Sequence, residues 1–252
     1  MTSDYSVCAL VPVYNHGSTA GEVVAEITAR GLPVILVDDG SDEDTRAALI
    51  RIDERHESCT LVRLRENSGK GGAVMAGLAM AREEGFSHAL QIDADGQHDL
   101  QEIPVFLEKS RERKGALIAG APVYDESAPK SRLIGRKITN FWIAVETLSR
   151  DIPDAMCGFR VYPVDAALRA LRRSVVNRRM GFDIEVLVRL HWRRVPLIFL
   201  PVKVEYPEGG TSNFRMVRDN LGITAVHTKL FFGMLLRSPV ILASRLLRRF
   251  RA

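Results

Sequence analysis

Cysteine is scarce in this chain of 252 residues, which contains only Cys8, Cys59 and Cys157. The three are odd in number, far apart and without paired spacing, which argues against a disulfide scaffold and against a cysteine zinc site. The six histidines show no metal-ligand spacing either. These features fit a reducing compartment, and we expect a cytoplasmic protein.

Long hydrophobic runs and a basic leader are also missing from the first residues. Asp4 comes early, and the apolar stretch that follows is short and ends in Pro and Asn, so we expect a first strand there and not a signal peptide. With 46% hydrophobic and 26% charged residues, the composition is that of a globular protein. Disorder, collagen and a polytopic membrane protein are excluded.

Acidic residues are absent from the C-terminal end. From Asn220 onward the chain has six basic residues and no acid, although the whole chain carries only +4. Residues 1–219 therefore hold 29 basic and 31 acidic residues, a net charge of −2. A nucleic-acid binder usually spreads positive charge over its folded surface, so we expect no nucleic-acid partner.

The first half alternates short apolar runs with segments of helical periodicity. Strands are expected at 7–13, 34–37, 60–64, 89–92 and 116–119, and helices at 22–30, 42–55, 71–84 and 100–114, with Ser41 or Asp42 as the N-cap of the second helix. This rhythm predicts an α/β fold with a mostly parallel sheet and helices on both faces.

The second half is less regular. We expect helices at 131–150 and 182–191, and strands at 158–162 and 195–204. The simplest division is a catalytic domain over 1–215 and a C-terminal amphipathic helical tail over 216–252.

Notable residues gather at the carboxyl ends of the first four predicted strands, at positions 12–15, 38–41, 67–72 and 93–97. In parallel α/β sheets, ligands bind outside the carboxyl ends of the strands. The four segments are therefore expected to form one binding site.

The sharpest of these segments is Asp93-Ala94-Asp95-Gly96-Gln97. Two carboxylates this close after a buried strand suit Mg²⁺ or Mn²⁺ bound jointly with substrate phosphates. A solvated turn is the alternative for an isolated D-x-D. Gln97 argues against the haloacid-dehalogenase motif, which has Thr at that place.

Two further segments suit a nucleotide. In Asn67-Ser68-Gly69-Lys70-Gly71-Gly72, backbone N–H groups and Lys70 can bind an anion, although the segment is not a Walker A loop. Asp38 and Asp39 follow the second strand and can accept hydrogen bonds from a base or a ribose. A tight turn and a helix cap are the structural alternatives.

Together these segments resemble family 2 glycosyltransferases of the GT-A fold, and among them the polyprenyl-phosphate branch typified by dolichyl-phosphate-mannose synthase. The matching stretches are VPVYN, VDDGS, NSGKGGAVMAG, DADGQHD and CGFRVY, over residues 11–162. The resemblance implies a nucleotide-diphospho-sugar donor, UDP- or GDP-linked, and a divalent metal. It places Asp93, Asp95 and Gln97 at the metal, and the donor at Pro12, Tyr14, Asp38, Asp39, Lys70, Asp93, Ser212 and Arg215.

The same resemblance implies inverting transfer of a hexose to an acceptor bound by the second half. The carboxylates of Asp154 and Glu185 are the candidate catalytic groups, Asp154 as a base or a sugar contact and Glu185 as a base, although either could instead be an ion-pair partner of nearby arginines. Arg132, Arg136 and Arg160 are candidates to bind the acceptor, because a phosphate acceptor needs positioning by cations. A solvated helix face is the alternative for Arg132 and Arg136.

The apolar stretch 230–244 is about fifteen residues long and is interrupted by Arg237 and Pro239. It is shorter than a membrane-spanning helix, and arginines follow it. We expect it to lie on an anionic membrane surface, which would attach the protein peripherally to the cytoplasmic face of the inner or plasma membrane. Packing on the catalytic domain is the alternative.

The leading hypothesis is thus a metal-dependent inverting glycosyltransferase with a lipid-linked or membrane-presented acceptor, polyprenyl phosphate or a glycan end. A nucleotidyltransferase that makes nucleotide sugars is disfavoured, because the loop after the first strand, VPVYNHGS, lacks a basic residue. A non-catalytic nucleotide-binding scaffold is the third alternative.

Overall fold

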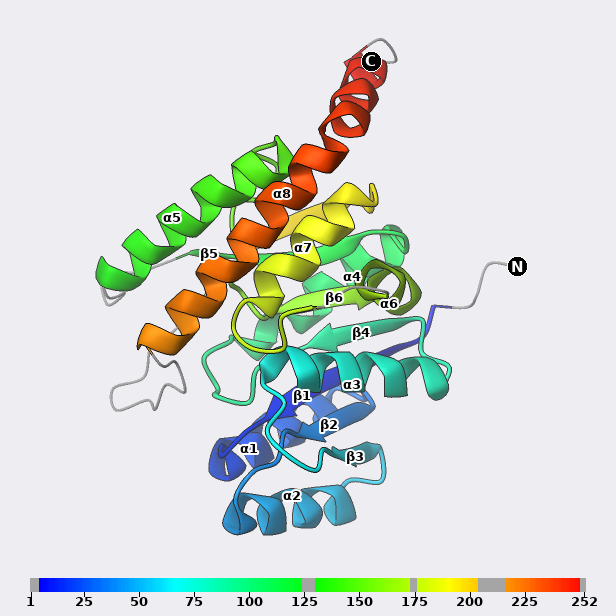
Figure 1. The fold of residues 1–252 in the computed structure, drawn as a ribbon. Coiled ribbons are helices and arrows are strands. Elements are labelled where there is room, and N and C mark those ends of the chain that lie inside the picture. The colour runs from blue at the N-terminus through cyan, green and yellow to red at the C-terminus, as the bar shows by residue number, and fades with distance from the viewer. Residues whose placement is uncertain (1–4, 124–129, 173–175, 204–215, 250–252) are drawn as a thin grey trace.

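The computed structural model describes residues 5–123, 130–172, 176–203 and 216–249, with residues 130–132 and 244–249 described by their backbone alone. Figure 1 shows a sheet with helices packed around it and a long C-terminal helix along one side. The strands are β1 (Val7–Val13), β2 (Val34–Asp38), β3 (Cys59–Arg63), β4 (His88–Gln91), β5 (Leu117–Val123), β6 (Arg160–Pro163) and β7 (Leu197–Lys203). The helices are α1 (Gly17–Ala29), α2 (Glu43–Arg55), α3 (Lys70–Glu83), a 3₁₀ turn (Leu100–Glu102), α4 (Ile103–Glu112), α5 (Lys130–Thr147), α6 (Val164–Leu171), α7 (Phe182–Trp192) and α8 (Met216–Arg249).

The seven strands form one sheet in the order β3-β2-β1-β4-β6-β5-β7. Every neighbouring pair is parallel except the two that involve β6, which runs antiparallel to both β4 and β5. The reversal places Arg160, the first residue of β6, opposite Gln91, the last residue of β4. Residues that precede β6 therefore reach the same edge of the sheet as the loops that follow β1 to β4.

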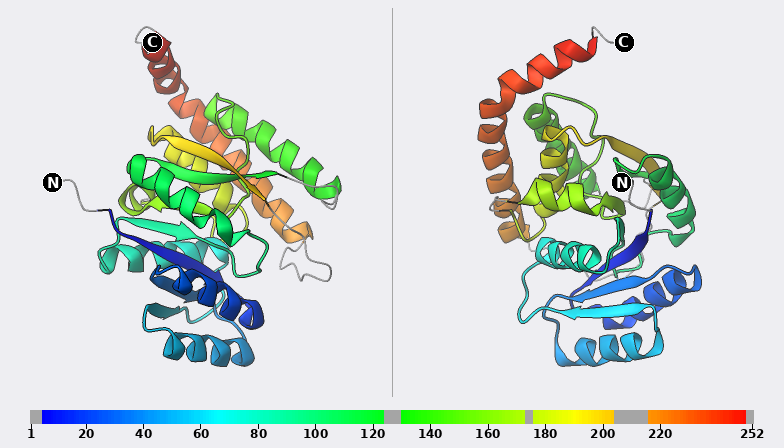
Figure 2. Two further views of the ribbon diagram at one scale, coloured as in Figure 1. Left: turned by 180° about the vertical axis from the view of Figure 1, so that it is seen from behind. Right: turned by 90° about the vertical axis from the view of Figure 1, so that its right-hand side faces the viewer.

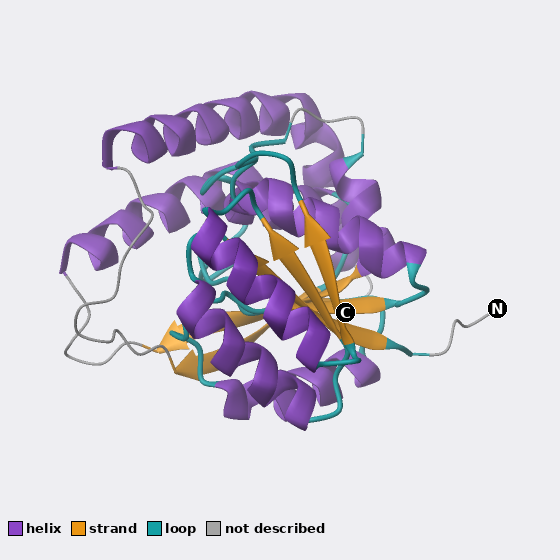
Figure 3. Ribbon diagram, turned by 90° about the horizontal axis from the view of Figure 1, so that it is seen from below, coloured by secondary structure: helices purple, strands orange, loops and turns teal. Residues whose placement is uncertain are grey.

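Helices cover both faces of the sheet, as the sequence predicts (Figure 3). Side chains alternate along β1, so that Leu10 packs in the core under α3, α6 and α7, whereas Val11 packs in the core under α1, α2 and α4. Both residues are fully buried. Strands buried on two sides explain why their sequences are almost continuously apolar.

The predicted strands are confirmed, and the helices differ at their ends. Asp42 is the N-cap of α2, and its carboxylate accepts a 2.9 Å hydrogen bond from the Thr45 N–H. Helix α1 begins at Gly17, five residues before the expected start, because the glycines and small polar residues of its first turn hide the apolar period. Helix α6 was not expected, because it begins at Val164 directly after β6 with no turn residues between them.

Helix α8 is longer than the apolar stretch 230–244 indicates. It runs through Pro239 without a break, and Met216–Ala243 is long and apolar enough to cross a membrane by length and composition. The apolar stretch 230–244 is therefore part of a longer helix that starts well before it. Val226, Leu230 and Met234 of α8 are buried in the body of the protein, and α8 lies beside α5 and α7 (Figures 1 and 2).

Candidate functional site

The four loops after β1, β2, β3 and β4 meet at one edge of the sheet, as predicted. Asn15 N–H donates to Ser41 Oγ at 3.1 Å, and Ser68 N–H donates to Asp39 Oδ1 at 2.7 Å. Thr19 Oγ1 donates to the carbonyl of Ala94 at 2.6 Å, which ties α1 to the loop after β4. A cavity of about 1370 Å³ opens at this junction and takes wall residues from all four loops.

Most of the predicted donor residues line this cavity, namely Pro12, Tyr14, Asp39, Lys70 and Asp93. Asp38 does not. Its side chain is buried, its Oδ1 accepts the Ser41 N–H at 2.9 Å, and its Oδ2 lies 3.9 Å from Arg63 Nε. The first aspartate of the pair therefore shapes the loop, and the second faces the cavity. Ser212 and Arg215 lie outside the described residues.

Asp39 is held by backbone N–H groups of the loop after β3. Burial raises the pKa of its carboxyl, and the N–H groups of Ser68 and Gly69 and the charge of Arg179 oppose that rise. Arg179 also lines the cavity, so a cation from the segment before α7 faces the loops that follow β2 and β3. Sequence reasoning missed Arg179 because nothing in its neighbourhood sets it apart from the other arginines of this region.

Lys70 is the first residue of α3, and the turn before it is tight. Gly69 has a φ of +83°, and a Cβ at that position would lie 2.4 Å from the carbonyl oxygen of Arg178. Only glycine therefore fits there. The turn brings the Lys70 ammonium to the cavity at the N-terminal end of α3, an arrangement that favours a bound anion.

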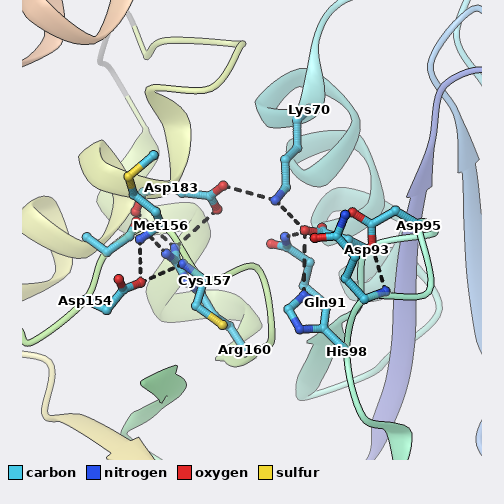
Figure 4. Close-up of polar contacts among 12 residues, drawn as sticks. Lys70, Gln91, Asp93, Asp95, His98, Asp154, Met156, Cys157, Arg160 and Asp183 are labelled. Atoms are coloured by element: carbon cyan, nitrogen blue, oxygen red, sulfur yellow. Dashed lines mark hydrogen bonds and ion pairs between the residues drawn. The ribbon is translucent and has the colours of Figure 1, made fainter. Parts of the chain in front are cut away.

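The two aspartates of the D-x-D segment have different partners (Figure 4). Asp93 Oδ2 lies 2.8 Å from Lys70 Nζ, and Asp93 Oδ1 accepts from Gln91 Nε2 at 3.2 Å. Asp95 lines the cavity, and its Oδ1 accepts the Gln97 N–H at 3.1 Å. Asp93 is thus committed to Lys70, whereas the Asp95 carboxylate is placed to bind a ligand in the cavity.

Opposite charges dominate the titration of this pair. Burial by itself raises the pKa of Asp93, but Lys70 and His98 outweigh it and hold the pKa well below its usual range. Burial likewise opposes the charge on Lys70, but Asp183 and Asp93 outweigh it and raise the pKa of Lys70. Both groups are therefore ionised at neutral pH, Lys70 as ammonium and Asp93 as carboxylate.

A divalent metal fits this site only in company with a ligand. Among the described residues, no group of three or more His, Cys, Asp and Glu side chains could hold a metal ion by itself. Asp95 and Gln97 instead present a carboxylate and an amide to the cavity. Mg²⁺ is commonly held by one or two carboxylates plus substrate phosphates, so this donor set suits a metal shared with a diphosphate.

Asp183, the second residue of α7, was not among the predicted site residues. Its Oδ2 lies 3.1 Å from Lys70 Nζ, and its carboxylate is buried. It lies two residues before Glu185, one of the predicted catalytic residues. Glu185 is fully buried, and the ammonium of Lys229, the guanidinium of Arg189 and the N–H of Asn177 all contact it. Glu185 is not among the residues that line the cavity.

The predicted acceptor residues lie in different environments. Arg136, on α5, lines the cavity and is paired with Asp154, whose Oδ1 accepts the N–H groups of Met156 and Cys157 at 2.9 and 2.8 Å. Arg160 is fully buried, and its guanidinium donates to the carbonyls of Ala155 and Asp183. The structure therefore does not bring Arg160 to the cavity wall. The side chain of Arg132 lies outside the described residues.

One arm of the cavity runs between α5 and α8. Apolar side chains of both helices line it, namely Ile134, Ile138, Trp142, Ile223 and Phe231. Large apolar side chains also stand exposed on the outside of the two helices, including Phe141 at 63% and Leu236 at 83% exposure. The polar end of the cavity and its apolar arm together suit a ligand with a charged head and a hydrocarbon chain.

Comparison with known proteins identifies relatives of this chain. The sequence profile of glycosyl transferase family 2 matches residues 8–178. Dolichyl-phosphate beta-glucosyltransferase of Dictyostelium discoideum is 27% identical over 201 residues, which are 74% of this chain and 60% of that protein. UDP-N-acetylglucosamine–dolichyl-phosphate N-acetylglucosaminyltransferase of Methanococcus voltae is 22% identical over 222 residues, 82% of this chain and 88% of that protein. The chain spans 55–65% of the length of the dolichyl-phosphate glucosyltransferases it matches.

Solved structures share the fold. Glucosyl-3-phosphoglycerate synthase from Mycobacterium tuberculosis, in complex with Mn²⁺ and UDP-glucose, superposes with a TM-score of 0.66 at 17% identity, over 93% of this chain and 79% of that one. Mannosyl-3-phosphoglycerate synthase from Rubrobacter xylanophilus superposes with a TM-score of 0.58 at 17% identity, over 98% and 76% of the two chains. The predicted GT-A fold is thereby confirmed.

Proposed function

The chain belongs to glycosyltransferase family 2, and from this premise we propose that it transfers a hexose, with inversion, from a nucleoside-diphosphate sugar to a polyprenyl phosphate at a membrane. The observation that carries the proposal is the continuity of one cavity. Its walls run from Asp39 and Lys70, at the nucleotide loops, to Trp142 and Phe231, on the apolar arm between α5 and α8. A donor and a lipid-linked acceptor can therefore meet in it.

On the donor side, Asp39 binds the nucleoside and Lys70 binds the diphosphate. Pro12 and Tyr14 line the cavity beside Asp39, and Arg179 faces the same space. A cation beside a departing diphosphate stabilises charge that grows in the transition state, which is where such a contact accelerates transfer.

Asp95, with Gln97 beside it, would hold a Mg²⁺ or Mn²⁺ ion together with the donor phosphates. A bound divalent ion neutralises charge on a leaving diphosphate. The relatives of known structure include one solved with Mn²⁺ and UDP-glucose, which supports a metal here without specifying which ion. Asp93 acts beside this position by holding Lys70 at 2.8 Å.

On the acceptor side, Arg136 binds the phosphate of the lipid. Asp154 holds the Arg136 guanidinium and is itself fixed by two backbone N–H groups. A phosphate is already an anion and needs no general base, so positioning by a guanidinium is the chemistry that this acceptor requires. The related proteins that act on dolichyl phosphate support this acceptor class.

The hydrocarbon chain of the acceptor would leave the cavity between α5 and α8 and enter the membrane. Exposed apolar residues on both helices would then lie in lipid, and we place the protein on the cytoplasmic face with α8 as its attachment. The arginines that follow residue 244 in the sequence favour an anionic leaflet.

The proposal is tested with the purified full-length chain, polyprenyl phosphate in detergent micelles, and UDP-glucose, UDP-N-acetylglucosamine or GDP-mannose as donor, each with Mn²⁺ or EDTA. We expect one donor to yield a polyprenyl-phosphate sugar detected by mass spectrometry. Free polyprenol, which lacks the phosphate, is the matched control and should not react. Transfer to polyprenol but not to its phosphate would overturn the acceptor assignment, and no product from any donor with either acceptor would overturn the enzyme assignment.

A further inference from the structure

Six side chains beneath the D-x-D segment form a closed ring of polar contacts. The ring begins and ends at the Lys70 ammonium. Four of its members are buried, and the other two, Lys70 and Asp93, are partly exposed where they line the cavity. In order around the ring, the members are Lys70, Asp93, Gln91, Tyr162, Arg160 and Asp183.

One half of the ring runs from Asp93, in the D-x-D segment, to strand β6. Gln91 Nε2 donates to Asp93 Oδ1 at 3.2 Å, and Gln91 Oε1 accepts from the Tyr162 hydroxyl at the same distance. Arg160 Nη1 donates to the Tyr162 oxygen at 3.3 Å. The antiparallel register of β6, which sets Arg160 opposite Gln91, makes this half possible.

The other half runs from β6 through α7 to Lys70, the first residue of α3. Arg160 Nη1 donates to the backbone carbonyl of Asp183 at 3.0 Å and lies 3.4 Å from its Oδ1. Asp183 Oδ2 lies 3.1 Å from Lys70 Nζ. Around the whole ring, the two cations Arg160 and Lys70 and the two carboxylates Asp183 and Asp93 balance in charge, which is the condition under which buried ions are tolerated.

The ring fixes how the Lys70 ammonium is oriented. An ammonium has three N–H donors. One N–H donates to Asp93 and a second donates to Asp183. Lys70 lies between these two carboxylates and also lines the cavity. With two N–H directions fixed by carboxylates from two different elements, the direction of the third is set as well.

We propose that Asp183 is a positioning residue for the donor: by holding one N–H of Lys70 it aims the remaining N–H at the donor diphosphate. This inference rests on the proposed donor site. Asp183 does not touch the donor itself, and it acts only through Lys70. Without it, Lys70 would pair with Asp93 alone and could turn about that contact.

The test measures binding of UDP and GDP to the full chain by titration calorimetry, in EDTA and in Mn²⁺, with uridine and guanosine as ligands that lack the diphosphate. Asp183→Asn keeps the size of the side chain and removes its charge. We expect it to weaken binding of the diphosphate by about tenfold to a hundredfold, the usual weight of a charge-assisted hydrogen bond, and to leave nucleoside binding unchanged. Asp165→Asn, at an exposed acid on α6, is the matched control and should bind as wild type does.

A double-mutant cycle with Lys70→Met separates positioning from a general structural role. If Asp183 acts through Lys70, then Asp183→Asn adds no further loss of diphosphate affinity in the Lys70→Met background. Losses that multiply, equal losses for nucleoside and diphosphate, or wild-type affinity of Asp183→Asn would each overturn the inference.

Asp183→Glu, which keeps the charge, is measured in the same double-mutant cycle. If Asp183→Asn does not fold, this variant tests whether Asp183 acts through Lys70. It displaces the carboxylate by one methylene, so we expect a smaller loss of diphosphate affinity that again disappears in the Lys70→Met background. If wild type binds neither UDP nor GDP, the proposed function itself fails. If wild type binds nucleotide and transfers sugar while the Asp183 variants match it, only this inference fails.

Discussion

Arg136 on α5 is paired with the buried carboxylate of Asp154, which two backbone N–H groups hold from the opposite side. A guanidinium fixed in this way at a cavity wall is preorganised to bind an anion, because little side-chain conformational entropy is lost when the anion binds. The pair joins α5, a helix with exposed apolar side chains, to the loop that leads into β6.

Arg136→Gln is expected to raise the KM for polyprenyl phosphate by about tenfold or more, since a charge-assisted contact is lost, and to leave the KM for the donor unchanged. Asp154→Asn should act in the same direction and less strongly, because the amide can still accept a backbone N–H. Steady-state kinetics with each substrate varied in turn measure both effects. Arg193→Gln, at an exposed arginine that ends α7, is the control, and a rise in the donor KM instead would contradict the acceptor assignment.

Asp95→Asn is expected to lower transfer at least a hundredfold with little change in melting temperature, because the Asp95 carboxylate faces the cavity and its one described hydrogen bond is to a backbone N–H. The readouts are product formation and thermal unfolding. Asp44→Asn, at an exposed acid on α2, provides the comparison. Wild-type turnover by Asp95→Asn would remove Asp95 from the metal site.

Asp39→Ala is expected to raise the donor KM more than it lowers kcat, because a nucleoside contact is made equally in the ground state and the transition state. Asp39→Asn keeps an acceptor for the Ser68 N–H and should show a smaller rise. A larger loss in kcat than in KM would place Asp39 in the chemical step.

The same residue gives a pH prediction for stability. Burial raises the pKa of Asp39 in the folded protein above the value of about 3.9 expected when unfolded. At pH values between the unfolded pKa and the higher folded pKa, the folded state binds more protons than the unfolded state. The ionisation of Asp39 therefore lowers the free energy of unfolding as the pH rises. Asp39→Asn removes this dependence, so the melting temperature of the variant should rise relative to that of wild type as the pH increases above the unfolded pKa of about 3.9. A constant difference would show that Asp39 does not titrate in this way.

The three cysteines are expected to resist alkylation in the native protein. All are buried, and burial raises the pKa of Cys8, Cys59 and Cys157 to about 12 each. At pH 8 almost no thiolate is present, and the thiolate is the form that reacts. Mass spectrometry after iodoacetamide treatment should find no adducts until the protein is unfolded in urea. Rapid labelling of the folded chain would contradict the burial of these thiols.

Leu236→Glu on α8 is expected to weaken binding to anionic lipid vesicles severalfold without lowering the melting temperature, because Leu236 is 83% exposed and contributes little to the core. Vesicle co-sedimentation and thermal unfolding measure the two effects. Val105→Glu introduces the same charge at an exposed apolar residue of α4, on the other face of the sheet, and should leave vesicle binding intact. If both substitutions weakened vesicle binding equally, α8 would not be the part of the protein that binds the membrane.

Much of the fold follows from the sequence because the strands and helices of the first half have clear periods and turn signals between them. The direction of β6 does not follow, since a strand of four residues carries no information in its sequence about whether it pairs parallel or antiparallel. Helix α6 was missed for a related reason, because it follows β6 without a loop.

The meeting of the four loops was predictable from the topology, since carboxyl ends of parallel strands share an edge. The partners of Lys70 were only half predictable. Asp93 belongs to a recognisable segment, whereas Asp183 reaches Lys70 from a helix far along the chain, and neither spacing nor local composition records such a contact. Arg160 was expected at the acceptor because a phosphate acceptor needs positioning by cations, but its guanidinium is buried and donates to backbone carbonyls in the interior.

The closed ring has a consequence for the order in which the protein matures on the ribosome. Residues 67–72 and the D-x-D segment are synthesised early. The ring gains its last member, Asp183, only when α7 has emerged from the ribosome and packed against the sheet. Until then Lys70 has Asp93 as its sole carboxylate from the ring. A nascent chain that ends before α7 should therefore carry every nucleotide-facing strand and still bind the donor poorly.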